Sequence, residues 1–395
     1  MDTNSIYMYV SQWNEKMGAP GLGLFTFDTA TGAIEKLAQL DTEKSFGCSA
    51  IDPRRNVLYV CNEGNLFPQA GYNTGRVYCY RIDPATGRLT ELNHRDTYCQ
   101  YTSYLSLDPT GRYLVAANHS WTTYVTTVEK TADGRIVPVN IPNDALIDLF
   151  ALNEDGSLGE LVDIKKHVPA PELRYTLEGR LTTPHPHCAM RSPSGRLYAV
   201  CDKGDGHLYL YAINDEKREL KLLSRTLSDT PHSEPRYCAF HPTLPYLYVN
   251  HEHTPGDRIT LTTFRYDEEG HLEKVDTVHA DVGDHPAREP MRQQQGMCIA
   301  PNGRCIYTQA HGYDLLFAFA VDAATGLLHQ IQALPMEGEW PRSVTMSPGG
   351  RFLITTSLQG VIAVYAVGPD GTLADTGHRA WAQGGGFISF YRPQP

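Results

Sequence analysis

Two hydrophobic patterns alternate along the chain, and each is interrupted by its own kind of turn. In the first pattern, apolar residues recur at every second position, a turn of Asp, Asn, Thr and Gly follows, and a second strand comes after it. Seven copies occur, with first strands at residues 22–28, 76–83, 147–153, 208–214, 261–267, 316–322 and 362–368. The second pattern is a short strand, a turn usually spelled Pro-x-Gly-Arg, and an apolar strand that ends in polar residues.

The second pattern has six complete copies, whose turns begin at Asp52, Asp108, Ser192, His241, Ala300 and Ser347. A seventh copy is split between the termini, at residues 5–10 and 386–391. Four short strands in each period of roughly 55 residues are typical of a β-propeller blade. We therefore predict an all-β, seven-bladed β-propeller with four antiparallel strands per blade. It forms a single domain over residues 1–395, with the last blade closed by the N- and C-terminal segments.

The ring follows from burial, because a lone four-stranded sheet cannot bury both of its faces. Proline presets φ at each turn and the glycine after it tolerates positive φ. Pairing of the terminal segments removes two open sheet edges. Two stacked β-sandwich domains are the alternative fold. Three irregular stretches, 127–146, 163–183 and 279–295, are expected to lie over one face of the ring.

The composition of the chain limits the classes of partner that the protein can bind. The 34 Lys and Arg against 45 Asp and Glu give a formal net charge of −11, which argues against a nucleic acid or an anionic membrane as partner. No signal peptide or long apolar run is present, so we expect a cytoplasmic protein, a monomer or small homo-oligomer. The nine cysteines form no Cys-x-x-Cys pair and are expected to be buried, reduced thiols.

Polar residues recur at matching positions near the ends of the predicted channel strands. They are Asn62, Glu63, Asn118, His119, His185, His187, Asp202, Lys203, Arg236, His251, Glu252, His253, His311, Arg342 and Gln359. His185 and His187 alternate, so an extended strand places both imidazoles on one face. A hairpin between Arg236 and Glu252 would bring their charges together, either as a structural ion pair or as an anion-binding arginine beside a general acid or base.

Four segments give the chain a family resemblance. They are Pro184-His-Pro-His-Cys188 followed by Ser-Pro-x-Gly-Arg, Pro235-Arg236 followed by Ala-Phe-His-Pro, Tyr248-Val-Asn-His-Glu252, and Leu58-Tyr-Val-Cys-Asn-Glu63. Over essentially its whole length the chain resembles the β-propeller lactonase family, which includes propeller-type 6-phosphogluconolactonases and carboxymuconate lactonizing enzymes. The resemblance implies that His187, Arg236 and Glu252 are catalytic, with His185 beside them, and that no metal is needed. The lactonizing branch has an arginine at the position that His311 occupies in this chain.

The expected activity is hydrolysis of a sugar lactone without a cofactor. Opening a lactone requires a base, donors for the oxyanion and an acid for the leaving alkoxide. Glu252 is the predicted base, provided that burial raises its pKa toward neutrality; Arg236 would stabilise the oxyanion and His187 would shuttle the proton. The predicted substrate-binding residues are His185, His311, Glu63, Asn62 and Arg342.

Three alternatives stay open. A cycloisomerase would use the same residues to protonate an enolate, and a non-catalytic scaffold would use the histidines only for structure. A metal site is the third, because His185, His187, Glu252, His251 and His253 are competent ligands. No compact ligand motif joins them, so no metal is predicted.

Overall fold

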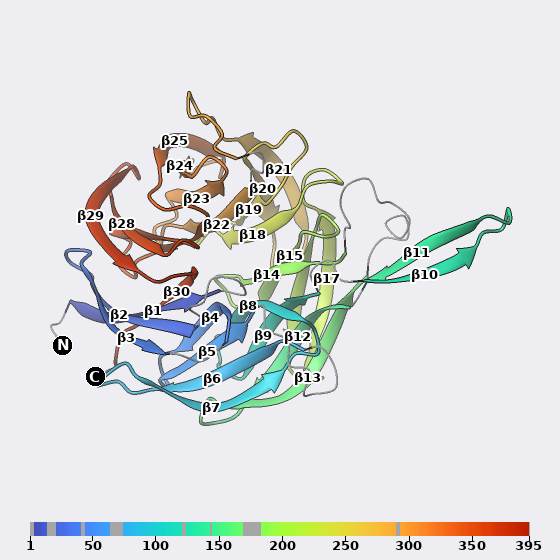
Figure 1. The fold of residues 1–395 in the computed structure, drawn as a ribbon, viewed down its shortest axis with the longest axis horizontal. Coiled ribbons are helices and arrows are strands. Elements are labelled where there is room, and N and C mark those ends of the chain that lie inside the picture. The colour runs from blue at the N-terminus through green and yellow to red at the C-terminus, as the bar shows by residue number, and fades with distance from the viewer. Residues whose placement is uncertain are drawn as a thin grey trace.

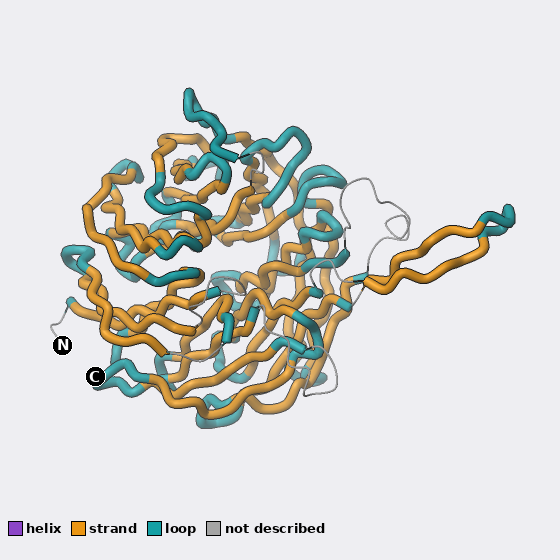
Figure 2. The backbone as a smooth tube through the Cα atoms, in the orientation of Figure 1, coloured by secondary structure: helices purple, strands orange, loops and turns teal. Residues whose placement is uncertain are grey.

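In the computed structural model of the chain, seven four-stranded antiparallel sheets, counted over the described residues, surround a central channel (Figure 1). The described residues are 4–13, 21–40, 44–63, 74–120, 124–142, 144–168, 183–289 and 293–394. Strands and loops make up this part of the chain, without a helix (Figure 2). The predicted seven-bladed β-propeller is therefore confirmed.

Blades 1 to 3 contain the following strands, in order from the channel outward. Blade 1 consists of β30 (Gly385–Tyr391), β1 (Ser5–Gln12), β2 (Gly21–Asp28) and β3 (Ile34–Leu40). Blade 2 consists of β4 (Phe46–Asp52), β5 (Val57–Asn62), β6 (Arg76–Ile82) and β7 (Leu89–Asp96). Blade 3 consists of β8 (Tyr101–Leu107), β9 (Tyr113–His119), β12 (Ala145–Leu152) and β13 (Leu158–His167). In each of them the first-named strand is the one nearest the channel.

The other four blades follow in chain order. Blade 4 consists of β14 (Pro186–Arg191), β15 (Leu197–Asp202), β16 (His207–Asn214) and β17 (Glu219–Leu227). Blade 5 consists of β18 (Pro235–Phe240), β19 (Tyr246–His251), β20 (Thr260–Tyr266) and β21 (Leu272–His279). Blade 6 consists of β22 (Gln293–Ile299), β23 (Cys305–His311), β24 (Leu315–Val321) and β25 (Leu328–Pro335). Blade 7 consists of β26 (Pro341–Met346), β27 (Phe352–Ser357), β28 (Val361–Val367) and β29 (Leu373–Trp381).

The ring is closed through blade 1. The inner strands contact one another in the order β30, β4, β8, β14, β18, β22, β26 and back to β30. The C-terminal strand β30 pairs with β1, with Tyr7 opposite Tyr391 and Val10 opposite Ile388. This pairing confirms the predicted closure by the two terminal segments, and it covers the edge of β1 that would otherwise be open.

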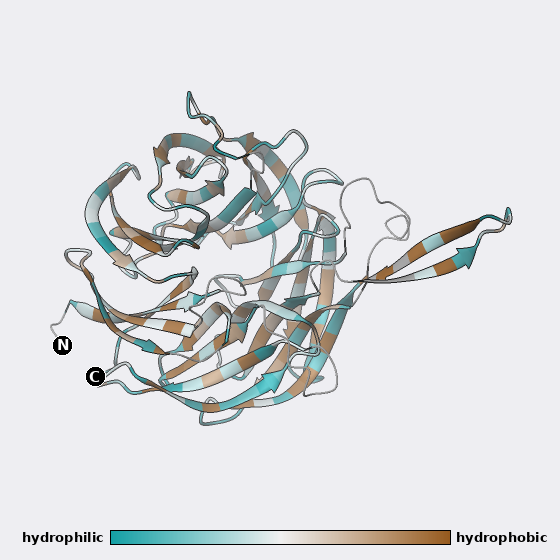
Figure 3. Ribbon diagram, viewed as in Figure 1, coloured by the Kyte–Doolittle hydropathy of each residue, from teal (hydrophilic) through white to brown (hydrophobic). Residues whose placement is uncertain are grey.

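The core lies between the blades. The second strand of blade 2, β5, is buried along its whole length, as is β19 in blade 5, whereas the outer strand β7 consists of half-buried and exposed residues. Along the strands, hydrophobic and hydrophilic bands alternate (Figure 3). All nine cysteines are free thiols, and all but the half-buried Cys298 are buried. Across the described part of the chain, no helix has the length and apolar character that a membrane crossing requires.

Tyrosine hydroxyls join neighbouring blades. Tyr59 of blade 2 donates to the Gly156 carbonyl of blade 3 at 2.6 Å, and Tyr248 of blade 5 donates to the Gly326 carbonyl of blade 6 at 3.0 Å. Tyr9 and Tyr307 make equivalent bonds to the Gly87 and Gly371 carbonyls, at 2.7 and 2.9 Å. Each tyrosine lies in a second strand and each glycine in an outer turn, so the two sequence patterns are linked physically.

The Pro-x-Gly-Arg turns have the predicted conformation. Gly111, Gly195, Gly303 and Gly350 have φ between 69° and 77°, a region in which a side chain would be strained. At Gly195 a Cβ atom would also lie 2.4 Å from Pro109 Cγ of the preceding blade. These glycines therefore permit both the turn and the close approach of the blades.

The insertion in blade 3 differs from its expected position. The hairpin of β10 (Tyr124–Lys130) and β11 (Ile136–Pro142) extends outward from the ring instead of covering one face (Figure 1). The expectation for stretch 127–146 is therefore wrong, because the two strands satisfy their backbone groups by pairing with each other. Of stretch 163–183, residues 169–182 lie outside the described part of the chain.

Candidate active site

The predicted polar residues meet at one end of the channel. Each second strand runs antiparallel to its inner strand, so the end of one lies beside the start of the other. The pairs include Phe46 with Asn62, Tyr101 with His119, Pro186 with Asp202, Pro235 with His251, Gln293 with His311, and Pro341 with Ser357. We call this end of the channel the polar rim.

A buried ion cluster occupies the rim at blades 4 and 5. The Arg236 guanidinium donates to Oε2 of Glu252, as the hairpin spacing predicts. Lys203, just after β15, donates to the same oxygen at 2.9 Å. The Gln293 amide donates to Oε1 of Glu252 at 3.3 Å. Arg236 and Glu252 are 3% and 7% exposed, so these charges interact with little screening by water.

The cations decide the protonation state of Glu252. Burial alone would raise the pKa of its carboxyl, but Arg236 and Lys203 outweigh burial and hold that pKa well below its usual range. The expectation that burial raises the pKa toward neutrality is therefore wrong. Glu252 is a carboxylate at neutral pH, and it binds a proton weakly.

Three histidines form a stack beside this cluster. His119, at the end of β9, lies 3.6 Å from His185, measured between ring centroids, and the His185 and His187 rings are 5.8 Å apart and within 4° of parallel. Burial lowers the pKa of all three imidazoles well below the usual value, and the positive charges of Arg236 and Lys203 lower it further. The stack therefore presents neutral imidazoles at pH 7. His187 also meets Tyr237 edge to face, at 5.0 Å.

Asp202 fixes the start of the histidine segment. One oxygen of its carboxylate accepts the His185 backbone N–H at 2.6 Å, and the other lies 2.7 Å from Nδ1 of His167. His167 in turn lies 2.9 Å from the Tyr211 hydroxyl through Nε2. All of these groups are buried. The chain of contacts holds the backbone at His185, and with it the alternation that directs both imidazoles to the same side.

A second ion pair lies on the rim between blades 2 and 7. Arg342 donates to both carboxylate oxygens of Glu63, at 3.1 and 3.3 Å, and its guanidinium lies 5.2 Å from the Trp13 ring centroid. Asn62 is turned away into its own blade, where its amide donates to the Ser45 carbonyl at 3.0 Å. Glu63 and Arg342 therefore face the rim, whereas Asn62 has a structural contact.

His311 lies on the same rim, in blade 6. Its ring stacks on Trp340 with 4.0 Å between centroids, and Nε2 is 3.2 Å from the Glu289 carboxylate. The neighbouring residue across the sheet is Gln293, which contacts both Glu252 and His253. His311 is thus one residue removed from the ion cluster. The sequence pattern did not predict the contacts of Gln293, Trp340 and Trp13. It placed Lys203 and His119 among the recurring polar residues but gave them no role.

The potential metal ligands on the rim already have other partners in the structure. Ligand atoms of Glu234, Glu252 and His253 lie within 4.8 Å of one another. The Glu252 carboxylate, however, already accepts bonds from Arg236 and Lys203, and His251 faces the Thr262 hydroxyl at 3.0 Å. A carboxylate neutralised by two cations is a poor ligand for a third.

Comparisons with known proteins identify relatives over most of the chain. The family model "Lactonase, 7-bladed beta-propeller" matches residues 7–390. The 6-phosphogluconolactonase of Bacillus subtilis (strain 168) is 25% identical over 348 residues, covering 87% of this chain and 85% of the relative. That of Pectobacterium carotovorum subsp. carotovorum (strain PC1) is 26% identical over 365 residues, covering 91% and 92%. The structure of a periplasmic gluconolactonase from Pseudomonas aeruginosa superposes with a TM-score of 0.77 at 22% identity, covering 98% of this chain and 99% of that one, and shows a shared fold.

Proposed function

The chain belongs to the seven-bladed β-propeller lactonase family, and from this premise we propose that it hydrolyses a sugar lactone of the aldonolactone type. The predicted family and the predicted enzyme class, a lactonase, are confirmed at this level. The curated relatives named 6-phosphogluconolactonase support a sugar-acid lactone as the substrate. The observation that carries the proposal is the buried cluster of Arg236, Lys203 and Glu252 beside the neutral imidazole of His187.

The proposed mechanism exchanges two of the roles expected from the sequence. His187 is the general base, because its imidazole is neutral at pH 7 and its buried Nδ1 has no hydrogen-bond partner among the described residues, whereas the Glu252 carboxylate is engaged by Arg236 and Lys203. Glu252 instead holds Arg236 and Lys203 in position.

Each step then has a group to perform it. His187 takes a proton from water while the water oxygen bonds to the lactone carbonyl carbon. Arg236 and Lys203 stabilise the resulting oxyanion. The tetrahedral intermediate collapses by breaking the bond to the ring oxygen, and the alkoxide that leaves takes the proton from His187. The product is the open hydroxy acid, and neither a metal nor a cofactor takes part.

The rest of the rim supports a polyhydroxylated substrate. Glu63 and Gln293 offer acceptors and a donor for sugar hydroxyls, and the Trp13 ring beside Arg342 offers an apolar face. Arg342 and His311 are the proposed contacts for a more distant anionic group, such as a 6-phosphate. His185 lines the site next to the base.

Lactone opening at pH 7 tests the proposal directly. Glucono-1,5-lactone and its 6-phosphate are compared, with spontaneous hydrolysis subtracted and the product identified as the hydroxy acid. We expect catalysis to persist in excess EDTA, and Glu252→Gln to lower kcat/KM by about 100-fold or more, because it releases Arg236 and Lys203 from their partner. Wild-type activity in Glu252→Gln would refute the site, and an unsaturated acid as product would assign the lyase alternative.

Inhibition by products tests the phosphate contact separately. If Arg342 binds a 6-phosphate, 6-phosphogluconate inhibits more strongly than gluconate, and Arg342→Met removes the difference. Equal inhibition of the unmodified protein by both acids would show that the substrate carries no phosphate.

A further inference from the structure

Three aromatic rings divide the channel into two halves. Tyr104 from blade 3, Tyr237 from blade 5 and Phe387 from blade 1 form a triangle in which the ring centroids are 6.2, 5.9 and 5.9 Å apart. We call these three residues the aromatic floor. The Tyr237 ring contacts His187 on the side of the polar rim. The floor therefore separates the proposed catalytic groups from the other half of the channel.

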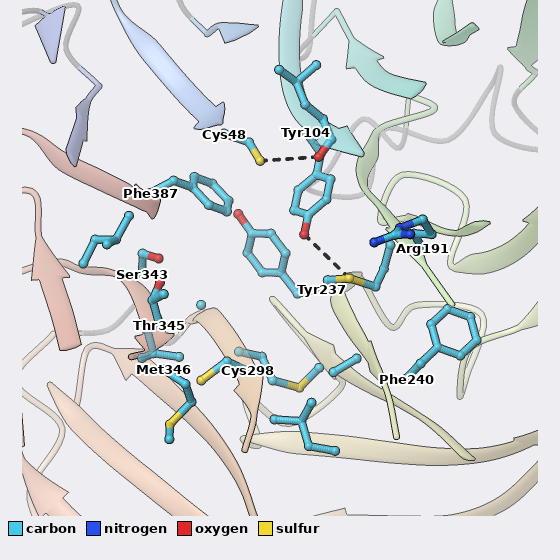
Figure 4. Close-up of a pocket in the computed structure, with 18 of the residues that line it drawn as sticks. Cys48, Tyr104, Arg191, Tyr237, Phe240, Cys298, Ser343, Thr345, Met346 and Phe387 are labelled. Atoms are coloured by element: carbon cyan, nitrogen blue, oxygen red, sulfur yellow. Dashed lines mark hydrogen bonds between the residues drawn. The ribbon is translucent and has the colours of Figure 1, made fainter. Parts of the chain in front are cut away.

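A cavity of about 520 Å³ lies on the far side of the floor (Figure 4). Each of the seven inner strands contributes to its wall, for example through Cys48, Tyr104, Met190, Tyr237, Met297, Thr345 and Phe387. The wall continues to Ser192 and Pro193, in the turn at the end of β14 that is remote from the rim. The cavity is thus reached from the opposite face of the ring, and its size is typical of a small-molecule site.

The wall is apolar but carries positive charge. Sulfur atoms are frequent, from Met190, Met297, Met346, Cys48 and Cys298. Flexible thioethers adapt to chains of varied shape. Among the described residues that line the cavity, none is acidic, and the charged ones are Arg191 and Arg342.

Arg191 is available to an anionic ligand. It is the last residue of β14, half-buried at the end of the cavity opposite the floor, and no ion pair joins it to a carboxylate in the described part of the chain. Figure 4 shows its guanidinium directed over the cavity toward the Tyr237 side. Arg342 is different, because it is already paired with Glu63 on the rim. A ligand with one negatively charged group would therefore pair with Arg191 at the entrance of the cavity.

The geometry points to a second ligand site in this cavity, for an amphipathic monocarboxylate with an unbranched alkyl tail. The carboxylate binds Arg191, and the tail lies along the methionines and ends against the aromatic floor. A guanidinium binds a carboxylate through two parallel hydrogen bonds, whereas the apolar wall favours the tail in proportion to its buried area. The site is distinct from the proposed catalytic groups, because the base and its cation cluster do not line this cavity; Arg342 is the proposed substrate contact that the two sites share.

Calorimetric titration of the full-length protein with hexanoate, octanoate and decanoate measures how the binding affinity depends on the length of the alkyl tail. We expect saturable binding with one ligand per chain, and an affinity that rises about four-fold for each added methylene. Octanol, which has the same tail without the charge, should bind at least 10-fold more weakly than octanoate. Failure of octanoate and decanoate to bind, or equal affinity for octanol and octanoate, would overturn the proposal.

Substitutions locate the site. Arg191→Met should weaken octanoate at least 10-fold and leave octanol unchanged, and Thr345→Phe should weaken both by filling the cavity. Arg196→Met is the matched control, because Arg196 lies in the turn after β14 and its side chain is 72% exposed. If Thr345→Phe fails to fold, Ala239→Leu fills the same cavity from β18. Octanoate binding that survives in a folded cavity-filled variant would assign the ligand to another surface and refute the proposal.

Discussion

At the scale of single residues, the decisive fact is that paired charges outweigh burial at Glu252. The carboxylate is 7% exposed, and burial alone would raise its pKa. Arg236 and Lys203 both donate to Oε2 of Glu252, and their charges lower the pKa of the carboxyl more than burial raises it. The same cations lower the pKa of His187, so the ion cluster ionises the carboxylate and keeps the imidazole neutral. Both groups are therefore unprotonated at pH 7, and the proposed division of roles rests on their partners: Glu252 is engaged by Arg236 and Lys203, whereas Nδ1 of His187 has no hydrogen-bond partner among the described residues.

The pH dependence of the rate tests that division. A general base works in its unprotonated form, and burial with Arg236 nearby lowers the pKa of His187 below the usual value near 6.5. We therefore expect kcat/KM to be constant as pH falls from 8 to about 6.5 and to decline only in more acidic solution. His187→Gln should lower the rate by about 100- to 10,000-fold and abolish that decline.

The control for this measurement is His271→Gln. His271 is an exposed residue in the turn between the outer strands β20 and β21, where it is paired with Asp267, and its loss should leave both the rate and the profile unchanged. An acid limb centred above pH 7, or full activity in His187→Gln, would contradict the assignment of His187 as base.

At the scale of elements, the second strands transmit stability between blades through their tyrosines. Tyr248 donates to the Gly326 carbonyl, whereas Tyr198, which has the same place in blade 4, has a buried hydroxyl with no hydrogen-bond partner in the described part of the chain. The corresponding Gly270 carbonyl accepts instead from the Ser224 hydroxyl of blade 4, at 2.5 Å. The repeated sequence pattern is therefore uneven in its contacts.

This difference predicts opposite outcomes for one substitution. Tyr248→Phe should lower the free energy of unfolding by about 1–2 kcal/mol, because it leaves the Gly326 carbonyl without its donor. Tyr198→Phe should be neutral or slightly stabilising, because it removes a buried polar group that lacks a partner. Urea unfolding of the two variants beside the unmodified protein measures both changes. Equal losses in the two variants would show that these tyrosines stabilise by packing alone.

At the scale of the whole molecule, sequence reasoning succeeded where one hairpin sets the geometry. A short Pro-x-Gly turn fixes which residues meet at the end of each hairpin, so Arg236 and Glu252 could be placed together from their spacing. The fold and the polar rim follow from the same local rule, repeated in every blade.

Features set by contacts between blades could not be inferred in this way. The pKa of Glu252 depends on Lys203 from the preceding blade, and the aromatic floor joins blades 1, 3 and 5 across the channel. Similarly, the stack of His311 on Trp340 crosses from blade 6 to blade 7. Only the closed ring determines which side chains meet across the channel, and the spacing along the sequence does not specify them.

Closure of the ring can be tested by shortening the chain. Removal of residues 385–395 deletes β30, which leaves β1 as an open edge and takes Phe387 from the aromatic floor. Because blades 2 and 7 both pack against β30, we expect loss of the cooperative unfolding transition and of lactone hydrolysis. A chain that ends at Arg392 keeps the Tyr391 hydroxyl bond to Asn56, at 2.6 Å, and should unfold like the full-length protein. Calorimetry of both truncated chains measures their unfolding transitions. An unchanged transition in the chain that lacks residues 385–395 would show that the ring does not depend on its terminal strand.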